Sequence, residues 1–210
     1  MGISQGVGQR MIAIIDYDAG NLKSVEKALL FLGEEAMVTS DAKEILGADK
    51  IILPGVGAFG EAMEKLNARG LSEVIKEAVK RKIPLLGICL GLQLLFEASE
   101  ESPGVEGLSI LKGTIRRIPD KEGFKVPHIG WNSLSINEQS RLFKDIPQES
   151  FVYFVHSYYL SAEEPIVAAT TDYVVNVHAA VEKEQVFACQ FHPEKSGEIG
   201  LKLLKNFASL

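Results

Sequence analysis

The sequence has few cysteines and no apolar segment long enough to cross a membrane as a helix. Only two cysteines occur in 210 residues, and neither a C-x-x-C zinc spacing nor a disulfide framework is present. No apolar run approaches the roughly eighteen residues that a membrane helix needs, and no charged and then apolar signal segment opens the chain. We therefore expect a cytoplasmic protein that binds no membrane and no metal.

An excess of basic residues is also missing. The chain has 22 Lys and Arg against 28 Asp and Glu, a net charge of -6. Since phosphate backbones and acidic lipids repel such a surface, we expect no nucleic-acid partner. The length fits one domain, which we place at residues 11–210. Residues 1–10 (MGISQGVGQR) are polar and glycine-rich, and we expect a disordered leader there.

Strand-like and helix-like patterns alternate through the first half of the chain. Apolar runs predict strands at 11–16, 36–39, 51–53 and just before Cys89, with amphipathic helices between several of them. Asn21 is expected to cap the first helix. This alternation predicts an α/β fold with a mostly parallel sheet and helices on both faces. After Glu101 we expect antiparallel strands, added to the same sheet at 109–118, 151–155, 166–170 and 186–191, and a closing helix at 197–208.

Cys89 lies where a predicted strand turns into a predicted helix. Gly87 and Gly91 flank it in the pattern G-x-C-x-G, the thiol counterpart of the elbow that raises a nucleophile above an α/β sheet. Free N–H groups at a helix start favour thiolate over thiol. The pattern indicates a nucleophile. Cys189 lies within an apolar run and is interpreted as a core residue.

A thiol nucleophile needs a base, and the base needs a group that orients it. His192 and Glu194 stand two positions apart around a proline, and in extended backbone such positions face the same way. The carboxylate can therefore hold one ring nitrogen while the other faces the sulfur. His128 and His156 are competing bases without a nearby carboxylate in sequence, and His178 is expected to be structural.

Backbone N–H groups beside Cys89 would stabilise an oxyanion. We expect one from Leu90 and a second from the loop that contains Val56 and Gly57. If the Val56 peptide must rotate to donate, the isolated chain would be nearly idle. Residues 55–60 also match G-x-G-x-x-G, but the match lies in the third unit of the fold and lacks the acidic residue expected after the next strand, so dinucleotide binding is disfavoured.

Three segments together resemble the class I glutamine amidotransferases: 54–57, 87–93 and 191–194. The resemblance extends over essentially the whole chain from Met11. Segments 54–59, 127–132, 153–158 and 192–196 are similar to the members of that family that serve histidine biosynthesis. Asp18 departs from the glycine usual in the first turn, but aspartate tolerates a left-handed backbone better than most residues.

The resemblance implies that Cys89 attacks the side-chain amide of glutamine, with His192 as general base and acid and Glu194 as the orienting carboxylate. It implies that the amino acid is held by Gly57, Gln93, Glu101, Ser157 and Tyr158. Ammonia would pass to a (β/α)8-barrel cyclase in a heterodimer, which makes imidazole glycerol phosphate and aminoimidazole carboxamide ribonucleotide. No cofactor is implied. Positions that resemble the interface are Asn21, Trp131, Asn132, Tyr153 and Lys195.

Several alternatives stay open at this point. The chain could be the glutaminase of another class I enzyme, such as one of guanylate, anthranilate or pyridoxal phosphate synthesis. It could be a catalytically silent regulatory subunit, although an intact Cys89, His192 and Glu194 argues against that. It could also be a thiol hydrolase or peptidase. Trp131 and Tyr153 could be core aromatics.

Overall fold

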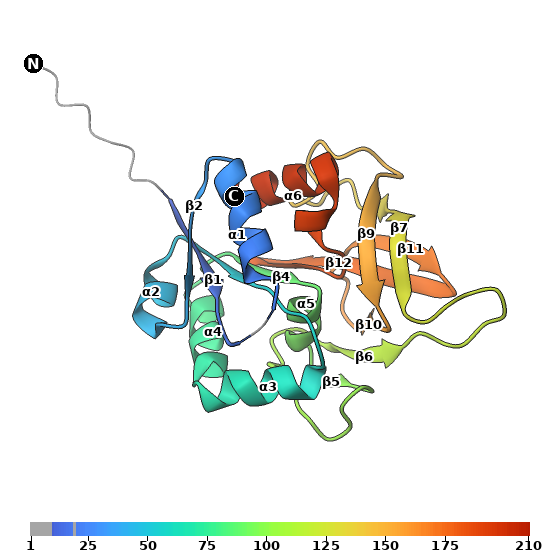
Figure 1. Cartoon of the computed structure of the whole chain (residues 1–210), viewed down its shortest axis with the longest axis horizontal. Helices are drawn as coiled ribbons and strands as arrows, with labels where there is room; N and C mark the ends of the chain where they lie inside the picture. Colours follow the sequence, from blue (N-terminus) through green and yellow to red (C-terminus); the bar gives the residue numbers. More distant parts are fainter. Residues whose placement is uncertain (1–9, 19) are drawn as a thin grey trace, which may run out of the picture.

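The computed structural model describes residues 10–18 and 20–210 (Figure 1). The leader expected at residues 1–10 lies outside this part, except for the exposed Arg10. The central sheet has the strand order β2-β1-β3-β4-β13-β12-β11-β8. Its strands are β1 (Met11–Ile15), β2 (Glu35–Thr39), β3 (Lys50–Leu53), β4 (Leu85–Ile88), β8 (Ser135–Ile136), β11 (Val167–Tyr173), β12 (Val175–Lys183) and β13 (Val186–Cys189).

The two halves of this sheet differ in strand direction. β2, β1, β3, β4 and β13 pair in parallel, whereas β12, β11 and β8 add antiparallel pairs. This confirms the predicted mostly parallel sheet with antiparallel additions. Because β13 pairs directly with β4, the segments that follow these two strands leave the same edge of the sheet.

Helices cover both faces of the sheet (Figure 1). They are α1 (Leu22–Phe31), α2 (Ala42–Gly47), α3 (Phe59–Ala68), α4 (Leu71–Lys80), α5 (Leu90–Leu94) and α6 (Gly197–Ser209). The pleat of β3 separates two cores: Ile52 packs in the cluster that contains α1 and α6, and its neighbour Ile51 packs with α3 and α4. No helix in the described ranges is long and apolar enough to cross a bilayer.

Two smaller sheets correct one sequence-based expectation. Segments 109–118 and 151–155 do not join the central sheet. The first contributes β6 (Gly113–Arg117) to a sheet with β10 (Tyr158–Ala162) and β5 (Ala98–Ser99), and the second forms β9 (Phe151–His156), which pairs with β7 (His128–Ser133). Alternation along a strand specifies which face is buried but not which strand lies beside it, so the pattern could not identify the partner.

Candidate active site

Cys89 occupies a strained corner between β4 and α5. Its φ of 55° and ψ of −109° lie outside the regions that non-glycine residues favour, at a cost of about 1–3 kcal/mol. Its glycine neighbours make the corner possible: a Cβ on Gly91 would lie 1.8 Å from the carbonyl oxygen of Leu53, and one on Gly87 would lie 2.8 Å from that of Gly91. The predicted strand-to-helix corner is confirmed.

His192 and Glu194 form a buried ion-pairing unit just after β13. The Nδ1 of His192 lies 2.7 Å from Oε1 of Glu194, and the two side chains are 1% and 0% exposed. Since a carboxylate oxygen accepts, Nδ1 is the donor and Nε2 is left for the pocket. Asn21 donates its Nδ2 to the same Oε1 at 2.5 Å. The carboxylate therefore holds the ring while the asparagine holds the carboxylate.

The environment of His192 raises its pKa to about 9. Burial alone would lower the pKa, but the proximity of the Cys89 sulfur, the interaction with Glu194 and the negative charges of both groups outweigh that effect. Within the described residues, Nε2 of His192 and Oε2 of Glu194 are buried without a hydrogen-bond partner. At neutral pH the ring is thus protonated, and its one free N–H is available to a bound molecule or to the sulfur.

A cavity of about 340 Å³ opens in front of Cys89 and His192. It gathers these two side chains, every residue that the sequence assigned to glutamine or to the oxyanion, and three others. The lining residues are Val56, Gly57, Cys89, Leu90, Gln93, Glu101, Pro127, Val155, His156, Ser157, Tyr158 and His192. Glu194 and Asn21 lie behind the histidine, outside this lining.

Two of the lining side chains also have structural roles. Oε2 of Glu101 accepts the backbone N–H of Phe59 at 2.8 Å, at the start of α3. Nε2 of Gln93 donates to the carbonyl oxygen of Tyr158 at 3.2 Å. These bonds fix both side chains before any ligand binds, which lowers the entropy cost of recognition.

The loop that was expected to supply an oxyanion donor presents a carbonyl to Leu90 instead. The N–H of Leu90 donates to the carbonyl oxygen of Gly55 at 3.3 Å. Gly55 is packed closely, because a Cβ there would lie 2.3 Å from the Tyr17 hydroxyl oxygen. The Leu90 donor is therefore occupied in this conformation.

His128 and His156 form a second buried pair, on β7 and β9. The Nδ1 of His156 lies 2.9 Å from the carbonyl oxygen of Tyr158, so it must carry the hydrogen. Its Nε2 then accepts from Nδ1 of His128 at 3.0 Å. Burial lowers the pKa of His128 to about 4 and that of His156 to about 3. His178 accepts the N–H of Ala162, which is a structural contact.

The five predicted interface residues differ in their exposure and in their hydrogen-bond partners. Trp131 is 55% exposed and meets Tyr153 edge to face at 6.0 Å between ring centroids, so the core-aromatic alternative is wrong for Trp131. Lys195 is exposed, and Asn132 donates to the carbonyl oxygen of Asp172. Asn21 points inward to Glu194. It occupies the predicted N-cap position of α1, but its backbone is left-handed (φ 73°) and its side chain makes no cap hydrogen bond.

Two further features of the chain are explained by their surroundings. Asp18 adopts the left-handed conformation expected of it, with φ 66°, and its carboxylate pairs with Arg69. The short helix α2 was missed, although its signal was present: Asp41 accepts the N–H groups of Lys43 and Glu44, as an N-cap does.

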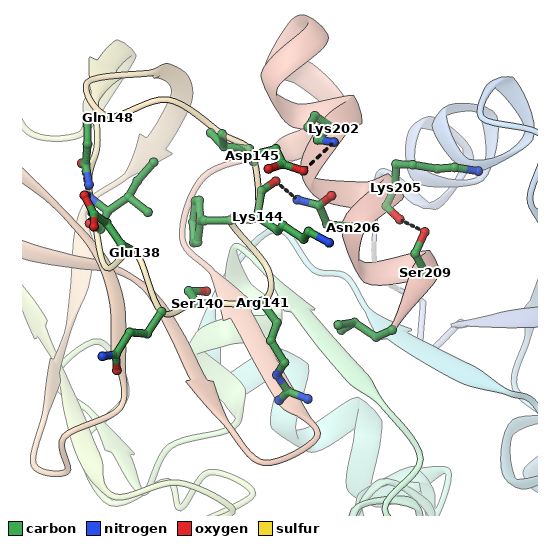
Figure 2. Close-up of a pocket in the computed structure, with 15 residues that line it drawn as sticks. Glu138, Ser140, Arg141, Lys144, Asp145, Gln148, Lys202, Lys205, Asn206 and Ser209 are labelled. Carbon is green, nitrogen blue, oxygen red and sulfur yellow. Dashed lines mark hydrogen bonds and ion pairs between the residues drawn. The ribbon is translucent and has the colours of Figure 1, made fainter.

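A larger cavity of about 840 Å³ lies between the segment that precedes β9 and helix α6 (Figure 2). Its wall carries Arg141, Lys144, Lys202 and Lys205, and an ion pair joins Lys202 to Asp145. No cysteine or histidine lines it. Although this cavity is larger than the one at Cys89, it lacks a thiol and an imidazole, so we do not assign the reaction to it.

Comparison with known families and proteins gives consistent matches. The class I glutamine amidotransferase family matches residues 13–209. Imidazole glycerol phosphate synthase subunit HisH of Caldanaerobacter subterraneus subsp. tengcongensis is 52% identical over 201 residues, 95% of this chain and 98% of that protein. The protein of the same name from Methanocaldococcus jannaschii is 49% identical over 200 residues, 95% of this chain and 100% of that protein.

Solved structures share the fold at much lower identity. A crystal structure of a glutamine amidotransferase superposes with a TM-score of 0.73 at 19% identity, over 94% of this chain and 99% of that chain. The structure of PurLQS from Thermotoga maritima gives a TM-score of 0.70 at 20% identity, over 96% of this chain and 98% of that chain. Both support the architecture.

Proposed function

Because this chain belongs to the class I glutamine amidotransferase family, we propose that it is the glutaminase subunit of an imidazole glycerol phosphate synthase, in histidine biosynthesis. Residues 11–210 act as one amidotransferase domain. The observation that carries the proposal is the arrangement of Cys89 and a carboxylate-bound His192 in one cavity. Relatives named HisH match nearly the full length of the chain.

The reaction begins at the sulfur. The Cys89 thiolate attacks the side-chain amide carbon of glutamine, and a tetrahedral oxyanion forms. Protonated His192 then gives its Nε2 proton to the amine, so the C–N bond breaks and ammonia leaves. Neutral His192 next takes a proton from water, whose oxygen attacks the glutamyl thioester and releases glutamate. Throughout, Glu194 keeps Nδ1 protonated and the ring oriented.

Recognition of glutamine is assigned to the wall of the cavity. Gly57, Gln93, Glu101, Ser157 and Tyr158 line the same space as the sulfur. Gln93 and Glu101 offer side-chain oxygens suited to an α-ammonium group, while backbone groups near Ser157 and Tyr158 suit the α-carboxylate. No cofactor takes part in this scheme.

The oxyanion donors are assigned to the Leu90 N–H and to the loop at Val56 and Gly57. For Leu90 to donate, its bond to the Gly55 carbonyl must open. Rotation of the peptide between Gly55 and Val56 would remove that carbonyl and turn an N–H toward the substrate. The isolated chain is therefore nearly idle, and a partner that favours the rotated loop activates it.

The partner is a (β/α)8-barrel cyclase, which uses the ammonia to make imidazole glycerol phosphate and aminoimidazole carboxamide ribonucleotide. Trp131, Asn132, Tyr153, Lys195 and Asn21 are assigned to this interface. The outer face of β7 and β9 supports the assignment, because Trp131, Ile129 and Phe151 on it are all more than half exposed.

We place the enzyme in the cytoplasm. Its two thiols are both buried and free, as suits a reducing compartment.

The test is glutamate release from glutamine, first by the chain alone and then with the cyclase and its ribonucleotide ligand. We expect low activity alone and strong stimulation by the liganded cyclase, which Cys89→Ala abolishes. Steady activity without stimulation would instead favour the glutaminase of another class I enzyme. No activity under either condition would favour a silent subunit.

A further inference from the structure

Gln190 is a fully buried polar residue that the mechanism above does not use. It stands between β13 and His192, is 0% exposed, and its backbone N–H donates to the carbonyl oxygen of Ala179 at 2.8 Å. Burying a carboxamide in a core costs free energy unless its groups are hydrogen-bonded. Its nitrogen, Nε2, lies 3.8 Å from Sγ of Cys89, so the side chain reaches the atom that reacts.

We propose that Gln190 is a further catalytic residue, whose Nε2–H donates to Sγ of Cys89 and both holds the sulfur in place and favours its thiolate form. The proposal rests on the proposed function, because it takes Cys89 as the nucleophile. Gln190 is then a neutral hydrogen-bond donor in a site whose charged donor is His192.

The carbonyl group of Tyr158 determines which end of the Gln190 carboxamide faces the Cys89 sulfur. The oxygen of Tyr158 can only accept, and Nε2 of Gln93 donates to it at 3.2 Å. The same Nε2 donates to Oε1 of Gln190 at 3.0 Å. Since Oε1 of Gln190 accepts there, the other end of its carboxamide, Nε2, is the end that faces the sulfur. The orientation is thus fixed by contacts rather than chosen.

The network also explains why the orientation is stable. If the Gln190 carboxamide were reversed, its NH2 group would face the NH2 group of Gln93, and a carbonyl oxygen would face a sulfur that must carry negative charge. Both contacts would be repulsive. A donor toward the sulfur is favourable for thiolate in particular, because hydrogen bonds to charged acceptors are about twice as strong as neutral ones.

Titratable side chains lie on the elements next to Cys89, and Glu101, His156 and Tyr158 line the same cavity. His192 and Glu194 follow β13, Cys189 ends β13, and Tyr17 follows β1 and donates to the carbonyl oxygen of Pro54. In the described part of the chain, none of them hydrogen-bonds to the Gln190 side chain, whose bonds are to Gln93 and Cys89. Because Gln190→Met adds no charge, a shift in that variant reports the lost N–H donor.

The experiment measures the rate at which iodoacetamide alkylates Cys89 as a function of pH, in the full chain, with the modified peptide identified by mass spectrometry to separate Cys89 from Cys189. In Gln190→Met, which keeps the side-chain volume, we expect the midpoint of the profile to rise by about one pH unit. Glutaminase kcat with the cyclase present should fall about 10- to 100-fold, with a smaller change in KM.

Gln190→Glu keeps the shape of the side chain and protects the test against a folding defect. Its carboxylate can accept from Gln93 but cannot donate to the sulfur, so the midpoint should rise at least as far. Gln148→Met is the matched control, because among residues 10–18 and 20–210 its carboxamide bonds only to the backbone of Ile136. That variant should lose stability without moving the profile.

The outcomes separate this inference from the proposed function. An unchanged midpoint in a folded Gln190→Met would overturn the catalytic role, whatever Gln190→Glu shows, and would leave Gln190 as a support for Gln93. A raised midpoint in Gln190→Met supports the role of Gln190 at the Cys89 sulfur, whether or not glutamine is the substrate. Absence of glutaminase activity in the wild-type chain with its cyclase would count against the proposed function and leave the alkylation result standing.

Discussion

The molecule contains two pairs of buried side chains in which the same imidazole ring behaves in opposite ways. In the first pair, His192 bonds to Glu194 at 2.7 Å and its pKa is raised to about 9. In the second, His128 bonds to His156 at 3.0 Å, and their pKa values are lowered to about 4 and about 3. Burial penalises the charged ring in both, and only the first pair contains a carboxylate.

The difference shows what separates a base from a core residue in this fold. His156 lines the same cavity as His192, so position alone does not select the catalytic histidine. A neutral ring that is locked to a carbonyl and to a second imidazole has neither a proton to give nor a free lone pair. Cys89 and the carboxylate of Glu194, which Asn21 holds, make the other ring chargeable.

The two pairs should differ most in their effect on glutaminase activity when one histidine of each pair is replaced. We expect His192→Asn to lower partner-stimulated glutaminase activity at least about 1,000-fold, because the proton transfers lose their carrier. His128→Phe should keep most of the activity. Phenylalanine can take the position of the ring between Phe154 and Tyr173, against which His128 stacks.

In His128→Phe we expect a loss of stability rather than a loss of activity. The substitution leaves Nε2 of His156 without its donor, and we expect a loss of about 1–3 kcal/mol in the free energy of unfolding. Urea unfolding of both variants checks this. A His128 variant that is folded yet as inactive as the His192 variant would remove the distinction between the pairs.

The two pairs should also limit stability at opposite ends of the pH scale. For His128 the folded pKa of about 4 lies below the ordinary value of 6.5, so the unfolded chain binds more protons below pH 6.5. Its contribution to the free energy of unfolding is complete above pH 6.5 and is lost as the pH falls toward 4. His156 acts in the same direction.

For His192 the sign is reversed. Its folded pKa of about 9 exceeds 6.5, so its contribution is complete below pH 6.5 and is lost as the pH rises toward 9. Urea unfolding from pH 4 to 9 should therefore show a maximum between these limits. His192→Asn should make the alkaline slope of the stability profile shallower, and His128→Phe should do the same to the acid slope, in addition to its pH-independent loss of stability. A variant in which both slopes change equally would contradict these directions.

The smallest effect is expected at Asn21. Glycine accepts the left-handed backbone of that position (φ 73°), so Asn21→Gly removes the donor to Glu194 with little strain. We expect glutaminase activity, measured without the cyclase to avoid the interface, to fall about fivefold. Asn21→Asp should cost more, since it places a second carboxylate beside Glu194. Wild-type activity in both variants would show that Glu194 needs no support.

The sequence predicted the parts of the site that lie close together along the chain. Gly87, Cys89 and Gly91 occur within five positions, and their spacing alone specifies the corner because no other residue fits the close approach to Leu53. His192 and Glu194 are likewise two positions apart. Local spacing therefore indicated Cys89, His192 and Glu194 as the candidate nucleophile, base and orienting group.

Contacts between distant segments could not be predicted in the same way. Asn21 and Glu194 are separated by 173 positions, and Gln93 and Gln190 by 97. Nothing in either local pattern indicates the pairing. The signal for Gln190 was a polar residue in the otherwise apolar run 186–191, which was interpreted only as a strand.

The occupied Leu90 donor was also beyond sequence reasoning. The glycines of the 55–57 loop permit more than one peptide orientation, and which carbonyl faces Leu90 depends on packing against Tyr17. The sequence could indicate that rotation is possible, but not which state the chain adopts.

The most direct test of the proposed mechanism is labelling with a diazoketone analogue of glutamine, in the presence of the cyclase and its ribonucleotide ligand. We expect one adduct, on the peptide that contains Cys89, formed more slowly when glutamine is added and much more slowly in His192→Asn. An adduct on Cys189, or a Cys89 that iodoacetamide alkylates but that neither the analogue labels nor glutamine protects, would contradict the mechanism.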